Sequence, residues 1–225
     1  MATTTPTDVA SNAQLSVQMK QGSQLEHEQA ENSKFVEDLL GGRIDAAGYL
    51  EYLQRLRIVY AALEEASREL ADDPQVRQIH DIALERVGTI DADLAHWAER
   101  AGVDLTPVSS EAAEAYAARI ADAKSWGGLL VAHHYTRYLG DLSGGQAIGA
   151  ILDRTFELGG QGVALYKFDL IEKNKPYKDE YRRKLDTIGD GLTPDERARI
   201  VDEVKAAFVL NHDLFAELNR VLSAK

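Results

Sequence analysis

The stretch HHYTRYLGDLSGGQAIGAIL, His133 to Leu152, has the pattern of a helix although it is rich in glycine. The glycines in its interior are Gly140, Gly144, Gly145 and Gly149. Each interior glycine costs a helix about 1 kcal/mol relative to alanine, so four cost about 4 kcal/mol. The net stability of a whole protein is only about 5–15 kcal/mol. A penalty of this size predicts a compensating role for the glycines.

Three roles are physically available: a kink, close packing of a neighbouring helix, or a ligand lying against the backbone. Gly140 and Gly144 are four residues apart and share a face, with Asp141 and Gly145 beside them. A flat, bulky ligand could therefore lie against bare backbone with Asp141 at its edge. In the alternative interpretation, the small residues admit another helix and Asp141 pairs with Arg137; the residues alone leave both open. A nucleotide is disfavoured, because GDLSGG lacks the Gly-Lys-Ser/Thr ending of a phosphate loop and follows no strand.

The composition predicts one globular domain in 225 residues, with 44% hydrophobic and 28% charged residues. A net charge of -12 disfavours nucleic acid as a partner. The absence of cysteine excludes disulfides and thiolate metal sites. The opening MATTTPTDVASNAQ has no basic start and no apolar core, which predicts a disordered tail over residues 1–12 and a domain over 13–225. No apolar run approaches the roughly 20 residues that span a bilayer, so we expect a cytoplasmic protein without stable membrane insertion.

Helical periodicity and cap signals dominate, and they predict an all-α fold. Asp45 is expected to start a long helix, and Thr193, Pro194 and Glu196 have the spacing of a capping box. Helices are further expected over 15–32, from Asp73 to about 100, from Ser109 or Ser110 to 123, over 126–158 and from about Tyr177, with a short one ending at Gly41 and Gly42. The last helix has an apolar stripe that includes one amide, Asn211, which needs a partner.

Five segments in this chain resemble the heme oxygenase family, in the order of that family, between Leu15 and Leu222. They are LEHEQAENSKF, YAALEEA, AHHYTRYLGDLSGGQ, YKDEYRRKL and AFVLNHDLFAEL. The resemblance implies a single-domain helical fold with heme sandwiched between a proximal helix and a kinked, glycine-rich distal helix. It also implies that heme b, as substrate and cofactor, is opened by O2 at the α-meso carbon to biliverdin IXα, carbon monoxide and ferrous iron. The electrons would come from a separate reductase or ferredoxin. The ending RVLSAK has no hydrophobic anchor, so the chain resembles the soluble bacterial form, with a monomer expected.

The resemblance implies that His27 ligates the iron and that Glu31 orients the His27 ring. By spacing alone, His27 lies on a polar stripe, which usually faces solvent. Asp141 matches the catalytic residue, which is expected to order water and deliver a proton. Gly140 and Gly144 would leave room for a bent ligand, and Tyr60 matches a tyrosine that supports the aspartate.

Positions that would bind the heme propionates are matched by Lys20, Lys178 and Arg182, with Tyr135 as a hydrogen-bond partner. Phe208, Asn211 and Phe215 match pocket residues of the last helix. Read without the resemblance, the cations form an exposed basic face and the aromatic residues belong to the core. Residues 167–184 hold seven basic and four acidic side chains, an excess that would also attract a reductase.

Two other functions are weighed against the enzyme: a heme carrier or sensor without turnover, and a helical scaffold without a cofactor. Asp141 beside the glycine face favours the enzyme over the carrier. The set of His27 and the three cations favours heme over the scaffold. A ferritin-like di-iron bundle is disfavoured, because no Glu-x-x-His spacing occurs.

Overall fold

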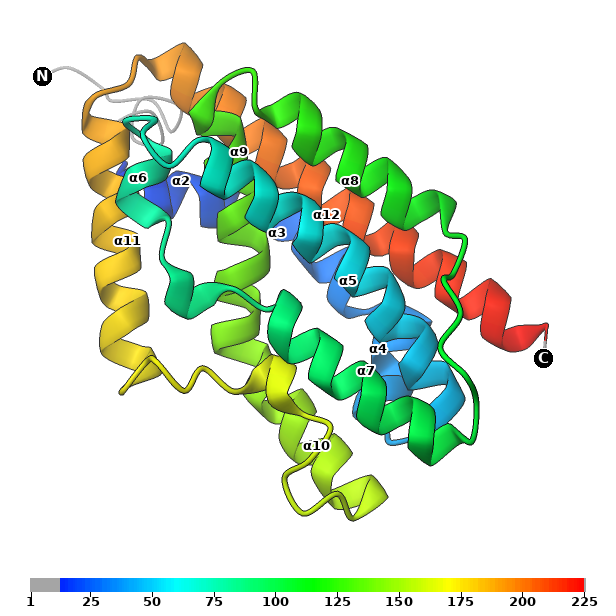
Figure 1. Ribbon diagram of the computed structural model, residues 1–225. Helices are drawn as coiled ribbons and strands as arrows, with labels where there is room; N and C mark the ends of the chain where they lie inside the picture. Colours follow the sequence, from blue (N-terminus) through cyan, green and yellow to red (C-terminus); the bar gives the residue numbers. More distant parts are fainter. Residues whose placement is uncertain (1–12, 225) are drawn as a thin grey trace, which may run out of the picture.

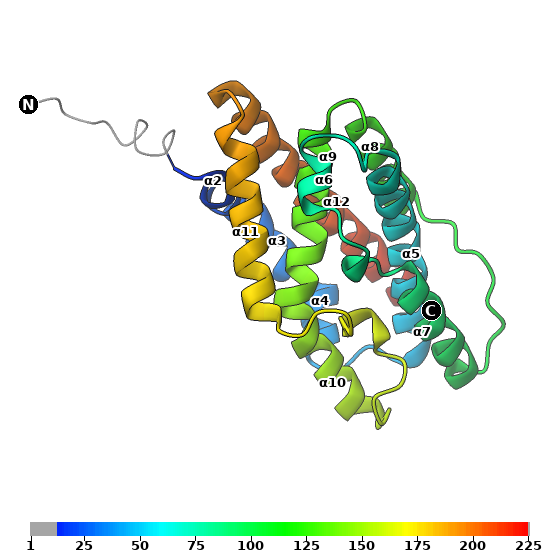
Figure 2. The same cartoon turned by 60° about the vertical axis from the view of Figure 1, so that its left-hand side comes forward.

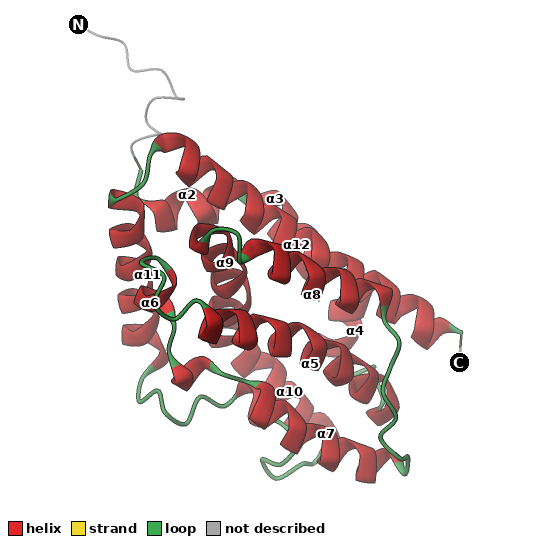
Figure 3. Ribbon diagram, turned by 45° about the horizontal axis from the view of Figure 1, so that its top comes forward, coloured by secondary structure: helices red, strands yellow, loops and turns green. Residues whose placement is uncertain are grey.

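Helices form all the regular secondary structure between residues 13 and 224, the part of the chain that the computed structural model describes (Figure 3). The expected all-α fold is confirmed. The tail expected over residues 1–12 lies outside the described residues. In chain order the α-helices are α2 (Leu15–Gly22), α3 (Gln24–Glu31), α4 (Lys34–Leu40), α5 (Ala46–Glu69), α6 (Val76–Ile79), α7 (Val87–Ala101), α8 (Glu111–Ala123), α9 (Gly127–His134), α10 (Gln146–Phe156), α11 (Asn174–Asp190) and α12 (Pro194–Ser223). Short 3-10 turns are η1 (Ile82–Leu84) and η4 (Ala164–Tyr166).

The two longest helices begin where the cap signals predict. At the start of α5, the side chain of Asp45 accepts a hydrogen bond of 2.7 Å from the amide of Gly48. At the start of α12, Thr193 and Glu196 form the reciprocal capping box, with a proline in the first turn. These interactions satisfy backbone amides that have no partner inside the helix. They could be predicted from the sequence because the residues involved lie within a few positions of one another.

Two predicted helices are interrupted. The helix expected from Asp73 to about residue 100 is instead α6, η1 and α7. The break is stabilised from outside the segment, because the buried carboxylate of Glu64 on α5 accepts the backbone amides of Arg86 and Val87 at the start of α7. The helix expected over 15–32 is divided into α2 and α3 at Ser23, whose hydroxyl donates to the carbonyl of Met19 at 2.7 Å.

The distal segment, residues 127–156, forms one bent column that runs beside α11 (Figures 1 and 2). Its centre is π-helical, in two stretches labelled η2 (Tyr135–Leu139) and η3 (Asp141–Gly145). A π-helix has more residues per turn than an α-helix, and π-helical turns within α-helices frequently occur at functional sites. The segment was expected as a helix over 126–158; it ends at Phe156, where Glu157 takes a left-handed conformation.

Helix α12 organises the core. It packs against α3, α8, α9 and η2, while α5 packs against α7 and α8. The predicted apolar stripe of α12 faces inward, with Ile200, Val204 and Leu218 fully buried. As a result, α12 is a common support for α3 and for the distal segment.

Candidate functional site

The four glycines of the distal segment divide into two pairs with different surroundings. A Cβ atom added at Gly140 or Gly144 would meet no other atom within 4 Å, and both residues are exposed. A Cβ atom at Gly145 would lie 2.9 Å from Cδ1 of Tyr166, and one at Gly149 would lie 3.2 Å from its Cβ. The first pair leaves an open face of bare backbone, and the second admits a close neighbour. The open pair leaves space that a ligand could fill, whereas the packed pair admits Tyr166 of a loop rather than another helix.

Asp141 lies at the edge of this open face, in a buried polar network. Its side chain accepts a hydrogen bond from the hydroxyl of Tyr60 on α5. The guanidinium of Arg137 donates to the same hydroxyl at 2.9 Å and lies 3.8 Å from Oδ1 of Asp141. It also donates to Oδ1 of Asn211 at 2.7 Å. Arg137 is thus the hydrogen-bond partner that Asn211, the amide on the α12 stripe, was expected to need. Asn211 is connected to Asp141 through Arg137 and the Tyr60 hydroxyl.

Burial controls the protonation of this network. It raises the pKa of the Asp141 carboxyl, while Arg137, the Tyr60 hydrogen bond and Arg86 act in the opposite direction. Burial also raises the pKa of the Tyr60 hydroxyl well above its ordinary value. Tyr60 therefore keeps its proton at neutral pH and remains a donor to Asp141. A carboxylate held this way retains free lone pairs that can accept from water or from a ligand.

His27 is on α3, which packs against α12. Its side chain is 46% exposed, and its Nε2 lies 3.4 Å from Oε1 of Glu31, one turn further on. The ring packs edge-on against Phe208, with 5.0 Å between the ring centroids. Phe208 and Asn211 are three residues apart on α12, so neighbouring positions of this helix contact His27 and Arg137. The fold thereby brings α3 and the distal segment to the same stretch of α12.

Helices α11 and α2 supply the cations predicted from sequence. Nζ of Lys178 donates to the hydroxyl of Ser143 in η3 at 3.2 Å. Arg182 pairs with Asp179 at 3.1 Å, and its charge opposes the rise that burial causes in the pKa of Tyr135. Lys20 is exposed on α2, which packs against α11. These cations therefore lie on adjoining helices beside the distal segment.

Phe215 is buried, whereas Phe208 on the same helix is only partly buried. It stacks against Phe35, with 5.7 Å between centroids, and lies close to Tyr52. From the sequence, Arg137 was considered only as a partner of Asp141, because the two residues are four positions apart. No sequence pattern indicated the contacts of Arg137 with Tyr60 and Asn211. Tyr166 was missed altogether, because it lies in a loop without helical periodicity.

Known proteins resemble this chain over almost its whole length. The family model described as heme oxygenase matches residues 13–217. Heme oxygenase 1 of Nostoc sp. is 38% identical over 215 residues, which cover 92% of this chain and 87% of that protein. Heme oxygenase 1 of Homo sapiens is 33% identical over 213 residues, with 93% and 73% covered.

Solved structures agree with the sequence relatives. The crystal structure of heme oxygenase-1 from the cyanobacterium Synechocystis sp., in complex with heme, gives a TM-score of 0.83 at 33% identity and covers 94% of this chain and 96% of that one. Heme oxygenase from Leptospira interrogans gives a TM-score of 0.85 at 30% identity, with 91% and 100% covered.

A helical fold with an open glycine face, a buried aspartate beside it and relatives of this kind defines an oxygenase that acts on heme. The chain belongs to the heme oxygenase family, and it is an enzyme of heme degradation. Within residues 13–224, no helix combines the length and the apolar character that crossing a membrane requires.

Proposed function

We propose that this enzyme binds heme between His27 and the backbone at Gly140 and Gly144, and opens it at the α-meso carbon. The products would be biliverdin IXα, carbon monoxide and ferrous iron, with O2 as co-substrate. The observation that carries this proposal is the open face at Gly140 and Gly144, where a Cβ atom would meet nothing. A helix gains about 1 kcal/mol from alanine in place of glycine, so an empty face without side chains favours a bulky ligand.

The residues present fit an iron porphyrin. A flat macrocycle needs a surface without side chains, and Gly140 and Gly144 supply one. Its iron needs an accessible imidazole, and His27 is half exposed, with Glu31 as the only polar partner of its ring among the described residues. Its propionates need cations, which α2 and α11 carry. The solved relative from Synechocystis holds heme on the same fold.

Each proposed ligand of the heme has a distinct task. When bound, heme supplies the iron that reacts with O2 and the carbon framework that is cleaved. His27 would hold the iron, and Glu31, 3.4 Å from Nε2, would fix the orientation of the ring. Phe208 would support the His27 ring from α12, while Phe215 would stabilise the core beneath it.

Asp141 would order water beside the open glycine face and hold a proton at its carboxylate for transfer through that water. A proton donor or acceptor of this kind contributes about 10²- to 10⁴-fold to a rate when its position is fixed. Tyr60 and Arg137 fix that position, because both contact the carboxylate from elements that are themselves buried. Asn211 in turn holds Arg137.

The cations would decide which carbon is attacked. Lys20, Lys178, Arg182 and the hydroxyl of Tyr135 would hold the propionates at one edge, which fixes the rotation of the macrocycle beneath Asp141. The two α11 cations are four residues apart and share a face, and the contact of Lys178 with Ser143 places that face beside η3. We therefore expect the IXα isomer as the product.

The electrons would come from a separate reductase or ferredoxin, attracted by the basic excess over residues 167–184. We further propose that the enzyme acts in the cytoplasm as a monomer. An electron donor with an acidic surface would complement that region of an otherwise acidic chain.

Two additions to the purified protein test this function. Hemin should produce a Soret band, which a scaffold without a cofactor site would not give. A reductant under air should then remove that band and yield biliverdin IXα by chromatography, which a carrier would not do. His27→Ala should weaken heme binding and abolish turnover, whereas His212→Ala, a change at an exposed histidine of α12, should leave both intact. A stable Soret band in the reduced, aerated wild-type protein would refute the proposal.

A further inference from the structure

Tyr166 occupies a loop that is anchored firmly to α7. The carboxylate of Asp93 accepts the backbone amides of Ala164 at 2.9 Å and Leu165 at 2.8 Å. Nε1 of Trp97 donates to the carbonyl of Gly162 at 2.7 Å. Asp93 and Trp97 are buried, so these hydrogen bonds are shielded from water. The chain entering Tyr166 is therefore fixed by two side chains of one helix.

The chain leaving Tyr166 and the tip of its side chain are also held. Nη1 of Arg86 donates to the carbonyl of Lys167 at 2.6 Å, and its guanidinium lies 4.0 Å from the centroid of the Phe168 ring. At the tip, the hydroxyl of Tyr49 on α5 donates to the hydroxyl of Tyr166 at 3.1 Å. Tyr166 is therefore held in a fixed position between α7, α5 and the distal segment.

The Tyr166 side chain lies directly against the distal segment next to Asp141. The position of an added Cβ atom at Gly145 is 2.9 Å from Cδ1 of Tyr166 and 3.8 Å from Cβ of Asp141. The position of one at Gly149 is 3.2 Å from the Cβ and Cδ2 of Tyr166. There is no room for even one methyl group at Gly145 unless the ring or the segment moves. The ring thus touches the segment at Gly145 and Gly149 and leaves the open positions at Gly140 and Gly144 free.

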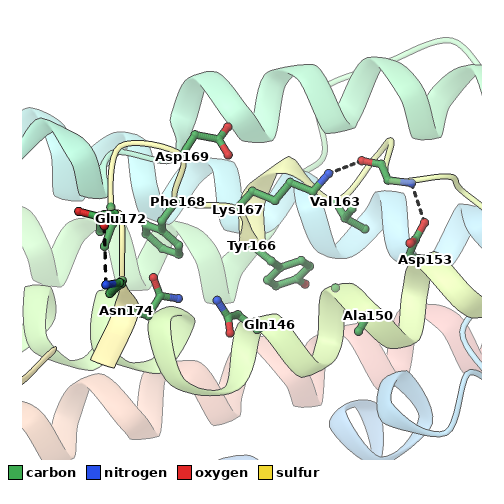
Figure 4. A pocket seen from close by; sticks show the side chains of 14 residues that line it. Gln146, Ala150, Asp153, Val163, Tyr166, Lys167, Phe168, Asp169, Glu172 and Asn174 are labelled. Atoms are coloured by element: carbon green, nitrogen blue, oxygen red, sulfur yellow. Dashed lines mark hydrogen bonds and ion pairs between the residues drawn. The ribbon is translucent and has the colours of Figure 1, made fainter. Parts of the chain in front are cut away.

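Beside this contact, a cavity of about 910 Å³ that is open to solvent lies between α10 and the loop, lined by residues that include Gln146, Gly149, Tyr166 and Phe168. Figure 4 shows the Tyr166 side chain reaching from the loop toward α10, between Gln146 and Ala150. Without the ring, the distal segment would have space to retreat from the heme face.

We propose that Tyr166 is a positioning residue: its ring sets how far the distal segment stands from the heme face, and thereby where Asp141 lies. The inference rests on the proposed function only for its consequence, since the contact exists in the heme-free protein. Asp141 moves with the segment, whereas its partner Tyr60 stays on α5. A change in the Tyr166 contact therefore alters the hydrogen bond between them.

Gly145→Ala tests the contact in the heme-free protein, with the neighbouring Gly144→Ala as the matched control. In Gly145→Ala the new methyl group should push the segment away from Tyr166 and lengthen the bond between Tyr60 and Asp141, so the pKa of Asp141 should rise. In Gly144→Ala the methyl group enters open space, and that pKa should stay at the wild-type value. The readout is a carbon-13 NMR titration of the Asp141 carboxyl carbon, assigned by its loss in Asp141→Asn.

Tyr166→Leu tests the same contact from the other side. Removal of the ring opens Asp141 toward the cavity and reduces its burial, so its pKa should fall, opposite to the change in Gly145→Ala. The double variant should lose less stability than the two single losses combined, because leucine leaves room for the methyl group. If Gly145→Ala does not fold, Gly149→Ala, with its milder contact, replaces it in the cycle.

An unchanged Asp141 pKa in Tyr166→Leu, or strictly additive losses of stability in the double variant, would overturn the inference. So would equal pKa shifts in Gly145→Ala and Gly144→Ala, since only one of these methyl groups meets the ring. Failure of the proposed function has a different signature: the wild-type protein would bind no heme or form no biliverdin, while these measurements on the heme-free protein would be unaffected.

Discussion

Asp141 is buried, yet its carboxylate keeps lone pairs that could accept further hydrogen bonds, as the proposed role in guiding O2 requires. Burial alone would neutralise the carboxyl, while Arg137, Tyr60 and Arg86 favour its charged form. The residue lies beside the open face of Gly140 and Gly144, within reach of any ligand that covers that face. Its chemistry therefore depends on partners contributed by α5 and by its own helix.

Asp141→Ala should still bind heme and give a Soret band, because neither His27 nor the glycine face is altered. Biliverdin formation should fall by about 10²- to 10⁴-fold, the contribution typical of a positioned proton donor. Single-turnover assays with chromatography of the pigments measure this. A normal yield of biliverdin from this variant would remove Asp141 from the mechanism.

Tyr60→Phe should remove one buried hydrogen-bond partner from Asp141 and one from Arg137. The variant should lose about 1–3 kcal/mol of stability. The pKa of Asp141 should rise, because the Tyr60 hydrogen bond lowers it. Chemical denaturation and NMR titration measure the two effects. Tyr138→Phe is the matched control, since no partner of the Tyr138 hydroxyl is found among the described residues; equal effects in both variants would contradict the account.

Among the helices, the distal segment is unusual because its glycines lower helix stability while Gly140 and Gly144 leave its backbone accessible. The cap signals of α5 and α12 were readable from the sequence, and so was the grouping of Gly140 and Gly144 on one face. The division of the four glycines into an open pair and a packed pair was not, because it depends on Tyr166, which comes from a loop anchored by Asp93 and Trp97. The break before α7 was likewise hidden, since Glu64 lies more than twenty residues away in the chain.

Gly144→Ala should separate the stability of the distal segment from its function. The heme-free variant should be as stable as the wild type or more stable, by up to about 1 kcal/mol, because its methyl group meets no atom and alanine favours a helix. Its affinity for heme should fall, because the methyl group projects from the face on which the macrocycle would lie. Thermal unfolding and hemin titration test both statements. Unchanged heme affinity would show that the ligand lies elsewhere.

At the scale of the whole molecule, the fold stores a buried neutral histidine. His134 lies in α9, where its Nδ1 is 2.7 Å from the hydroxyl of Tyr181 on α11. Burial lowers the pKa of His134 to about 3. This contact joins α11, with its cations, to the distal segment.

The free energy of unfolding should therefore depend on pH below neutrality. Unfolded His134 takes up a proton near pH 6.5, whereas the folded protein resists it until about pH 3. The stabilisation is complete above pH 6.5 and is lost as the pH falls toward 3, with a slope approaching about 1.4 kcal/mol per pH unit. Denaturation between pH 7 and pH 4.5 measures the slope. His134→Asn should flatten it, whereas His212→Asn, at an exposed site, should not; an equal slope in all three proteins would contradict this assignment.

Family and fold class were predictable from this sequence, because five segments carry the resemblance in order, and the same segments supplied the candidate site residues. The packing that positions the site was not, since it depends on contacts between distant segments, such as Arg137 with Asn211 and Tyr166 with Gly145. The open face and the Tyr166 contact involve different glycines of the same segment, and only the assembled molecule shows that relation.

A crystal structure of the heme-loaded protein tests the central claim most directly. The account predicts iron bonded to a nitrogen of His27, with the macrocycle in van der Waals contact with the backbone of Gly140 and Gly144 and with Asp141 beside its far face. Heme bound in the cavity between α10 and the loop of Tyr166, or iron held by a residue other than His27, would contradict it.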